Sequence, residues 1–172
     1  MRALTRCSSL AAALLAVLVA ATAHAAGPKP IGTITFVGRP DLAAIPIVDL
    51  QWAARNTASF GGGSGTAVGK ASFDDFRITK LLDAASPALL ELLLKGTTVV
   101  EVRIDVAVRR GTTASYVLST AIITANDRHL ADGAGPILQD ITLTARAISE
   151  TVVSPGGTVT TCFDVALNKS CD

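Results

Sequence analysis

The residues that could form a phosphate-binding or catalytic site are few in this chain and are poorly spaced for one. A glycine-rich cluster consists of Gly61, Gly62, Gly63, Ser64 and Gly65. The phosphate loop G-x-x-x-x-G-K-[ST] needs glycine at its first position and a hydroxyl residue at its last. Aligned on Gly69-Lys70, this chain has Ser64 and Ala71 at those positions. We therefore predict a flexible surface loop and no nucleotide cofactor.

Catalysis by a serine or by paired carboxylates is not predicted either. The pattern G-x-S-x-G fails at Ser64, because Thr66 stands where its last glycine belongs. Asp74-Asp75 is an acidic doublet, but neighbouring residues of a strand point to opposite faces. His129 lies in a polar stretch that we interpret as a solvated loop. We predict no catalytic residues; the alternative is a barrel hydrolase that gathers His129 with Asp and Ser side chains.

The cysteines favour a cross-link over a metal site. Cys162 and Cys171 lie close together in the sequence, whereas Cys7 lies in a segment that we expect to be removed. Two cysteines and one histidine are too few for a four-ligand structural zinc site, so no metal is predicted. An even number of cysteines in an oxidising compartment favours pairing. We expect a disulfide between Cys162 and Cys171, with two free thiols as the alternative.

Residues 1–25 have the layout of a secretory signal peptide. Arg2 and Arg6 precede an apolar run over residues 10–23, and small residues follow at the positions that signal peptidase reads. Cleavage is expected between Ala25 and Ala26. The apolar run is shorter than the ~20 residues of a membrane span. We predict a secreted, extracytoplasmic protein without stable membrane insertion; an uncleaved N-terminal anchor is the alternative.

Composition limits the remaining possibilities. The chain is 49% hydrophobic and 17% charged, with a formal net charge of +1, which is typical of a packed globule and not of a disordered segment. A nearly neutral chain has no electrostatic footprint for nucleic acid. The length that remains after cleavage suits one domain with its own core.

Short alternating runs predict antiparallel strands. In residues 100–109, apolar side chains alternate with mainly charged ones, so one face should be buried; the apolar set is Val100, Val102, Ile104, Val106 and Val108. A turn at residues 110–113 and a returning strand at 115–124 complete a hairpin. Further strands are expected at residues 31–37, 45–54, 67–80 (with an irregularity at Asp74-Asp75), 137–153 and 158–167.

One segment predicts a helix. Ser86 supplies an N-cap hydroxyl and Pro87 suits the first helical position. A leucine-rich run follows, in which we expect Leu90 and Leu93 to lie in the core, and Gly96 can adopt the left-handed closing conformation. A single helix among strands predicts a mostly β fold, namely a compact antiparallel β-barrel of two sheets with one short flanking α-helix.

The segment from Gly61 to Gly96 resembles the haemolysin-coregulated protein (Hcp) family, which forms the inner tube of type VI secretion systems. In that family a glycine-rich loop precedes a strand with a Phe-x-x-x-Lys-like ending and then an Asp-x-x-Ser-Pro helix start. Those places are held here by Phe76, Thr79-Lys80, Asp83 and Ala85-Ser86-Pro87. A weaker likeness, including Trp52 in an early strand, extends over residues 31–153.

The resemblance implies an Hcp-like barrel domain over residues 26–153 that assembles into homohexameric rings, which stack into tubes. The implied role is that of a type VI secretion tube component or secreted effector carrier. Its partners would be further copies of itself and effector proteins or other secretion-system components. The loop at residues 61–65 becomes a candidate assembly contact between rings.

Two features depart from the family. Tube subunits ordinarily lack a signal peptide, and the C-terminal extension at residues 154–172 lies beyond the usual end. Both suit a protein that folds outside the cytoplasm. The alternative function is an extracellular monomeric binding module on the same fold, without a role in a secretion machine.

Overall fold

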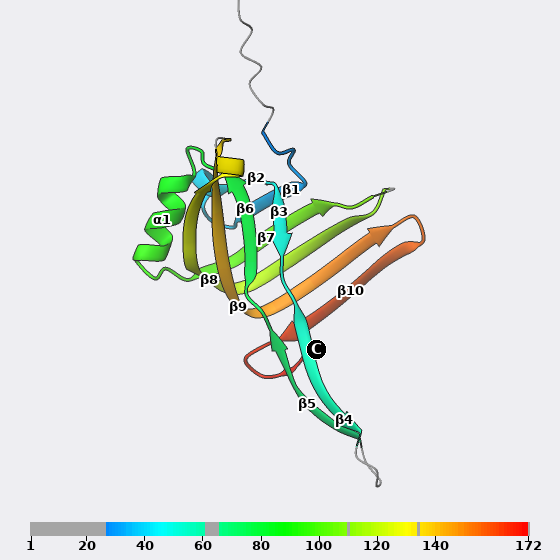
Figure 1. The fold of residues 1–172 in the computed structure, drawn as a ribbon. Helices are drawn as coiled ribbons and strands as arrows, with labels where there is room; N and C mark the ends of the chain where they lie inside the picture. The colour runs from blue at the N-terminus through cyan, green and yellow to red at the C-terminus, as the bar shows by residue number, and fades with distance from the viewer. Residues whose placement is uncertain (1–26, 61–65, 110, 134, 172) are drawn as a thin grey trace, which may run out of the picture.

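The computed structural model describes residues 27–60, 66–109, 111–133 and 135–171. Within them the chain forms a nine-stranded antiparallel sheet, a separate two-stranded sheet and one α-helix (Figure 1). The large sheet contains β1 (Gly32–Phe36), β2 (Ile45–Ile47), β3 (Asp49–Gln51), β6 (Phe76–Leu81), β7 (Val99–Ala107), β8 (Thr113–Leu130), β9 (Ile137–Ser154), β10 (Gly157–Asp164) and β11 (Lys169–Ser170). The small sheet contains β4 (Ala54–Phe60) and β5 (Thr66–Phe73), and the helix is α1 (Ser86–Leu94). The mostly β fold with one short helix is confirmed.

The strand pairings of the large sheet form a barrel-like circuit that the chain itself completes at Val48. β1 pairs with β7 and with β2, and Val48 joins β2 directly to β3. β3 pairs with β6, β6 with β9, β9 with β8, and β8 returns to β7. The Val48 N–H donates to the Thr79 carbonyl at 2.8 Å, at the point where the chain passes from β1 to β6. The range 45–54, predicted as one strand, is therefore divided between two sides of the circuit.

The long hairpin of β8 and β9 holds the two halves of the fold together. The first part of β9 pairs with β6 and the last part pairs with β10, while β8 runs alongside both. The β8–β9 register shifts between Ile123 and Ala125, and a bulge of this kind bends a strand. β8 continues to Leu130, beyond the predicted end at residue 124, because its backbone keeps pairing with β9 where the side chains are polar.

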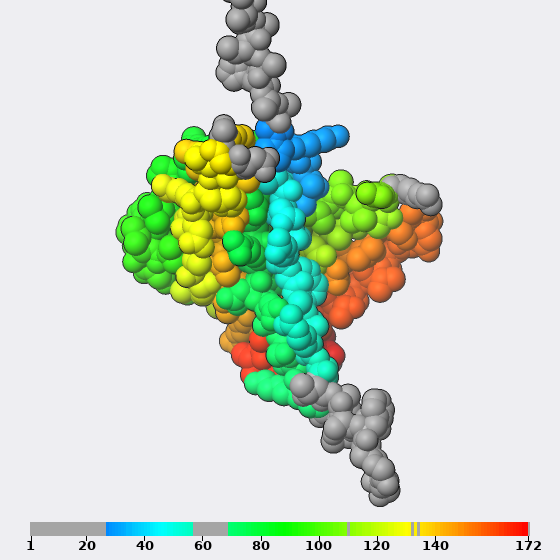
Figure 2. Space-filling view, in the orientation of Figure 1, coloured from blue at the N-terminus to red at the C-terminus, as the bar shows by residue number. Residues whose placement is uncertain are grey.

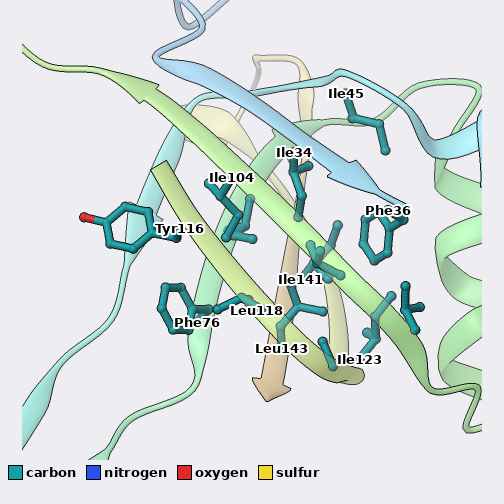
Figure 3. Packing of buried hydrophobic residues seen from close by; sticks show 14 of the residues in the cluster. Ile34, Phe36, Ile45, Phe76, Ile104, Tyr116, Leu118, Ile123, Ile141 and Leu143 are labelled. Atoms are coloured by element: carbon teal, nitrogen blue, oxygen red, sulfur yellow. The ribbon is translucent and has the colours of Figure 1, made fainter. Parts of the chain in front are cut away.

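The core lies inside this circuit. Figure 3 shows buried side chains from several strands converging there, among them Ile34, Ile104, Leu118, Ile141 and Leu143. Each of these five is 1% exposed or less. Trp52 is stacked on Phe76 with ring centroids 5.1 Å apart, which closes the core where β3 leads into β4.

The prediction for one face of β7 is correct in the middle and wrong at its start. Val102 and Ile104 are fully buried, but Val100 is 81% exposed, and Val108 lies beyond the strand end and is half exposed. The β7–β8 register gives Val100 no partner and passes over Thr120, whose φ of 53° is in the left-handed region. A residue in that conformation breaks the pleat. Val99 is buried in place of Val100.

Helix α1 begins and packs differently from the prediction. The N-cap residue is Ala85, without a side-chain cap, and Ser86 is the first helical residue. Leu89 and Leu92 are buried, whereas Leu90 and Leu93 are only half-buried. The predicted end is confirmed: Gly96 has a φ of 59°, and the N–H of Thr97 donates to the Leu92 carbonyl, as in a Schellman motif.

The Ser86 hydroxyl has another role, because it faces the buried amine of Lys80. Lys80 is fully buried, and its Nζ donates to the Leu81 carbonyl at 2.6 Å and to Asp83 Oδ1 at 2.7 Å. Ser86 Oγ lies 3.2 Å from the same Nζ and also accepts the Asp83 N–H. A buried cation needs such partners to offset the loss of water. This network ties the start of α1 to β6.

Candidate functional site

The part of the fold that stands apart from the barrel is the β4–β5 hairpin, which we call the arm. Its two strands pair with each other in a sheet separate from the large one, and they project away from the barrel (Figure 1). Side chains at its root fix its direction: Arg55 Nη1 lies 2.6 Å from Asp74 Oδ2 across the two strands. The Asp74 N–H donates to the Ala53 carbonyl at 2.8 Å.

The candidate assembly loop is the stretch that connects the two strands of the arm. Gly61, Gly62, Gly63, Ser64 and Gly65 all lie outside the described residues. What the structure gives is the strand on each side: β4 ends at Phe60 and β5 begins at Thr66. The ends of β4 and β5 that flank this stretch lie away from the barrel (Figure 1).

The acidic doublet marks the break between β5 and β6, at the predicted irregularity. Asp74 pairs with Arg55 of the arm, whereas Asp75 Oδ1 accepts the Thr144 hydroxyl of β9. The two carboxylates thus serve different partners and do not converge on one point. Their arrangement anchors the root of the arm on one side and the barrel on the other.

His129 lies on β8, not in the loop that we predicted, because β8 extends to Leu130. It lines an open recess together with Asp49, Arg77, Thr79 and Asp140. The Thr79 hydroxyl donates directly to Asp140 Oδ1 at 2.6 Å, while His129 Nδ1 lies 3.9 Å from Asp140 Oδ2. A catalytic triad needs the imidazole between the hydroxyl and the carboxylate. Here the imidazole stands to one side, so this cluster does not form such a relay.

The contacts of the Asp140 carboxylate explain why a charged group is buried at this position. It is 4% exposed, and Arg77 pairs with its other oxygen. Burial raises the pKa of Asp140, but hydrogen bonds from Thr79 and Arg77 outweigh burial and hold this pKa below its ordinary value. The ionised carboxylate thus joins β6 to β9.

Among the residues that the structure describes, no group of three or more His, Cys, Asp or Glu side chains is placed to hold a metal ion. Across the same described ranges, no helix is long and apolar enough to span a membrane.

The C-terminal extension continues the large sheet. β10 pairs with the last part of β9, and β11 pairs with the end of β10. Cys162 and Cys171 are placed as a disulfide pair with their Cα atoms 5.2 Å apart. Phe163 of β10 contacts Phe73 of β5, with ring centroids 5.0 Å apart. Figure 2 shows the C-terminal residues, in red, against the root of the arm.

Sequence reasoning expected a strand over residues 158–167 but missed its position in the fold. A run of β-branched residues favours a strand here: Thr158, Val159, Thr160 and Thr161. This local pattern does not identify β9 as the strand with which it pairs. The sequence alone therefore does not place this strand beside β9.

The fold is shared with proteins of one family. The sequence profile described as "Type VI secretion system effector, Hcp" matches residues 40–152. No curated protein matches the chain.

Solved structures match over most of the chain. The crystal structure of Hcp1 from Salmonella typhimurium is 16% identical, with a TM-score of 0.64 over 81% of this chain and 97% of that one. A type six secretion system protein gives 18% identity and a TM-score of 0.66, covering 74% and 86% of the two chains. A type VI secretion system effector from Yersinia pestis gives 21% and 0.55, covering 80% and 97%. The structures share the fold, and the profile match shows that this chain belongs to the Hcp family of type VI secretion proteins.

Proposed function

We propose that this chain is an exported subunit of a type VI secretion tube, or an effector carrier of the same kind, which forms closed hexameric rings through one repeated contact. Membership of the Hcp family supports a tube or carrier role. A ring needs a heterologous contact, in which two different surfaces of the same subunit meet. The subunit acts by its shape, and effector proteins or other secretion-system components are its further partners.

The observation that carries the proposal is the arm. β4 and β5 form their own sheet outside the barrel. The root of this sheet is held by the Arg55–Asp74 ion pair and by the contact between Phe73 and Phe163. An isolated two-stranded hairpin is marginally stable in water. An arm held in this way suits a contact with another subunit, and we assign its loop at residues 61–65 to the contact between stacked rings.

Export is the second part of the proposal. The signal layout of residues 1–25 and the Cys162–Cys171 pair both fit a chain that folds in an oxidising compartment. N-terminal sequencing and a thiol titration of the exported protein test this part. The expected result is a chain that begins at Ala26 and has no titratable thiol; an intact Met1 or two free thiols would contradict it.

The stacking contact is tested by adding charge to the arm. Gly63→Glu places a carboxylate in the loop, and Thr98→Glu adds the same charge at an exposed position between α1 and β7. In negative-stain images, Gly63→Glu should leave single rings but abolish stacks, while Thr98→Glu should behave as the unaltered chain. If the rings themselves dissolve with Gly63→Glu, the loop belongs to the lateral contact. Unaltered stacks would remove the loop from assembly.

A further inference from the structure

A small cross-linked hairpin ends the chain beside the root of the arm, and we call it the C-terminal hairpin (residues 162–171). Its two strands are the end of β10 and the short strand β11, which are antiparallel. Cys162 and Cys171 are placed as a disulfide pair at the end of this hairpin away from its turn, where the Cys171 N–H also donates to the Cys162 carbonyl. A covalent bond thus closes the last part of the C-terminal extension.

Packing contributes little to holding β11 in place. β11 is two residues long, and both of its residues are exposed. Leu167, in the turn before it, is 57% exposed. A segment with little buried apolar surface opens easily, whereas a cross-link restricts the open states that it can reach. We therefore expect the Cys162–Cys171 bond to be the main constraint that keeps β11 on β10.

The C-terminal hairpin contacts the arm through Phe163, which directly follows Cys162. The Phe163 ring lies 5.0 Å from that of Phe73, the last residue of β5. Val165 is partly buried against the core, lines a small recess together with Phe73, and donates its N–H to the Arg146 carbonyl of β9 at 2.8 Å. Because Phe163 lies near the end of β10, where a strand frays first, its position depends on β11 on one side as well as on β9 on the other.

The other side-chain contact at the root of the arm is a weak one. The Arg55 and Asp74 side chains of the ion pair are 63% and 50% exposed, and exposed pairs contribute little to stability. Both residues also belong to the arm's own two ends, so their pairing joins the arm to itself. The contact of Phe73 with Phe163 joins the arm to the large sheet. The position of the arm therefore depends on the C-terminal hairpin.

We propose that the Cys162–Cys171 cross-link is a redox switch for the arm: when it is closed, Phe163 is held against Phe73, and when it is open, the end of β10 frays and the arm is released. Closing joins the two Sγ atoms, and the two protons and two electrons that the thiols lose convert a disulfide oxidant into two thiols. Cys171 is exposed, so such an oxidant can reach the pair. Oxidants of this class act outside the cytoplasm, so the arm becomes fixed after export. This inference rests on the proposed function, in which the arm is a contact surface.

The test is amide hydrogen exchange of the exported chain before and after a phosphine reductant, at a concentration at which light scattering shows single chains. After reduction, the Asp74 N–H, which donates to Ala53 at the root of the arm, should exchange about threefold faster or more. A two-stranded hairpin is marginally stable alone, and an aromatic contact is worth about this factor. The Thr97 N–H, at the end of α1, should keep its rate. The double variant Cys162→Ser/Cys171→Ser should match the reduced chain and not respond to the reductant.

A matched pair of variants shows whether Phe163 transmits the effect. Phe163→Ala removes the ring but keeps the cross-link, so the arm should exchange as in the reduced chain. Val159→Ala shortens a side chain of the same strand that is 69% exposed, and it should leave the exchange of the arm unchanged. This pair also decides the question if the reduced chain fails to fold, because equal exchange in the two variants would overturn the inference.

The remaining outcomes separate the inference from the proposed function. If reduction leaves the exchange of the Asp74 N–H unchanged, or raises it together with that of Thr97, the cross-link does not act on the arm in particular; the inference is then wrong and the ring stands. Two titratable thiols in the exported chain would overturn it as well. If the arm is released on reduction but the oxidised chain stays monomeric at every concentration, the redox control is correct and the proposed ring falls.

Discussion

Phe73 and Phe163 meet with their ring centroids 5.0 Å apart, so the root of the arm rests on the strand that begins the C-terminal extension. The two residues lie far apart in the sequence. Their contact joins the root of the arm to the C-terminal extension. A change at one should therefore be felt at the other.

The energetic coupling between the aromatic side chains of Phe73 and Phe163 is measurable by a double-mutant cycle. Phe73→Ala, Phe163→Ala and the double variant should show a coupling free energy of about 0.5–1.5 kcal/mol, the range for aromatic pairs beyond their buried area. Denaturant unfolding of the three variants and the unaltered chain gives the value. Additive effects within error would mean that the arm and the extension are energetically independent.

The helix offers a matched pair of leucines. Leu89 is fully buried and Leu94 is 76% exposed, although both belong to α1. Leu89→Ala should lower the free energy of unfolding by about 2–5 kcal/mol, because it leaves a cavity in the core. Leu94→Ala should change it by less than about 0.5 kcal/mol. Equal losses in the two variants would show that the helix is packed on a different face.

Lowering the pH should remove the contribution that Asp140 makes to the stability of the fold. The pKa of Asp140 is lowered in the folded state, so its contribution to stability is present above the unfolded value near about 3.9 and is lost as the pH falls through the folded value. Between about pH 5 and pH 2 the unaltered chain should therefore lose more stability than Asp140→Asn, which cannot ionise. Thermal unfolding across this range checks it. Parallel curves for the two proteins would contradict the assigned role.

Much of the fold follows from local patterns in the sequence. The alternation around Val102 and Ile104, the break at Asp74-Asp75 and the closing Gly96 are local signals, and the structure confirms each. Family membership likewise follows from the segment around Phe76 and Ser86-Pro87, which lies within the matched range.

The errors have a common origin in long-range pairing. Val100 turns outward because Thr120, on another strand, adopts a left-handed conformation that no pattern near Val100 reveals. His129 lies in a strand because β9 pairs with a polar stretch. Ser86 faces the buried Lys80 instead of capping the helix, a choice that depends on how β6 meets α1. The position of β10 likewise depends on its pairing with β9, which no local pattern in residues 158–167 reveals.

The most direct test of the proposed function is the mass of residues 26–172 in solution, oxidised and at increasing concentration. Size exclusion with light scattering should give a hexamer, because an Hcp-family subunit with a projecting arm is expected to close into a ring. A mass that stays at one chain at every concentration, with no rings in negative-stain images, would contradict the account and favour a monomeric binding module.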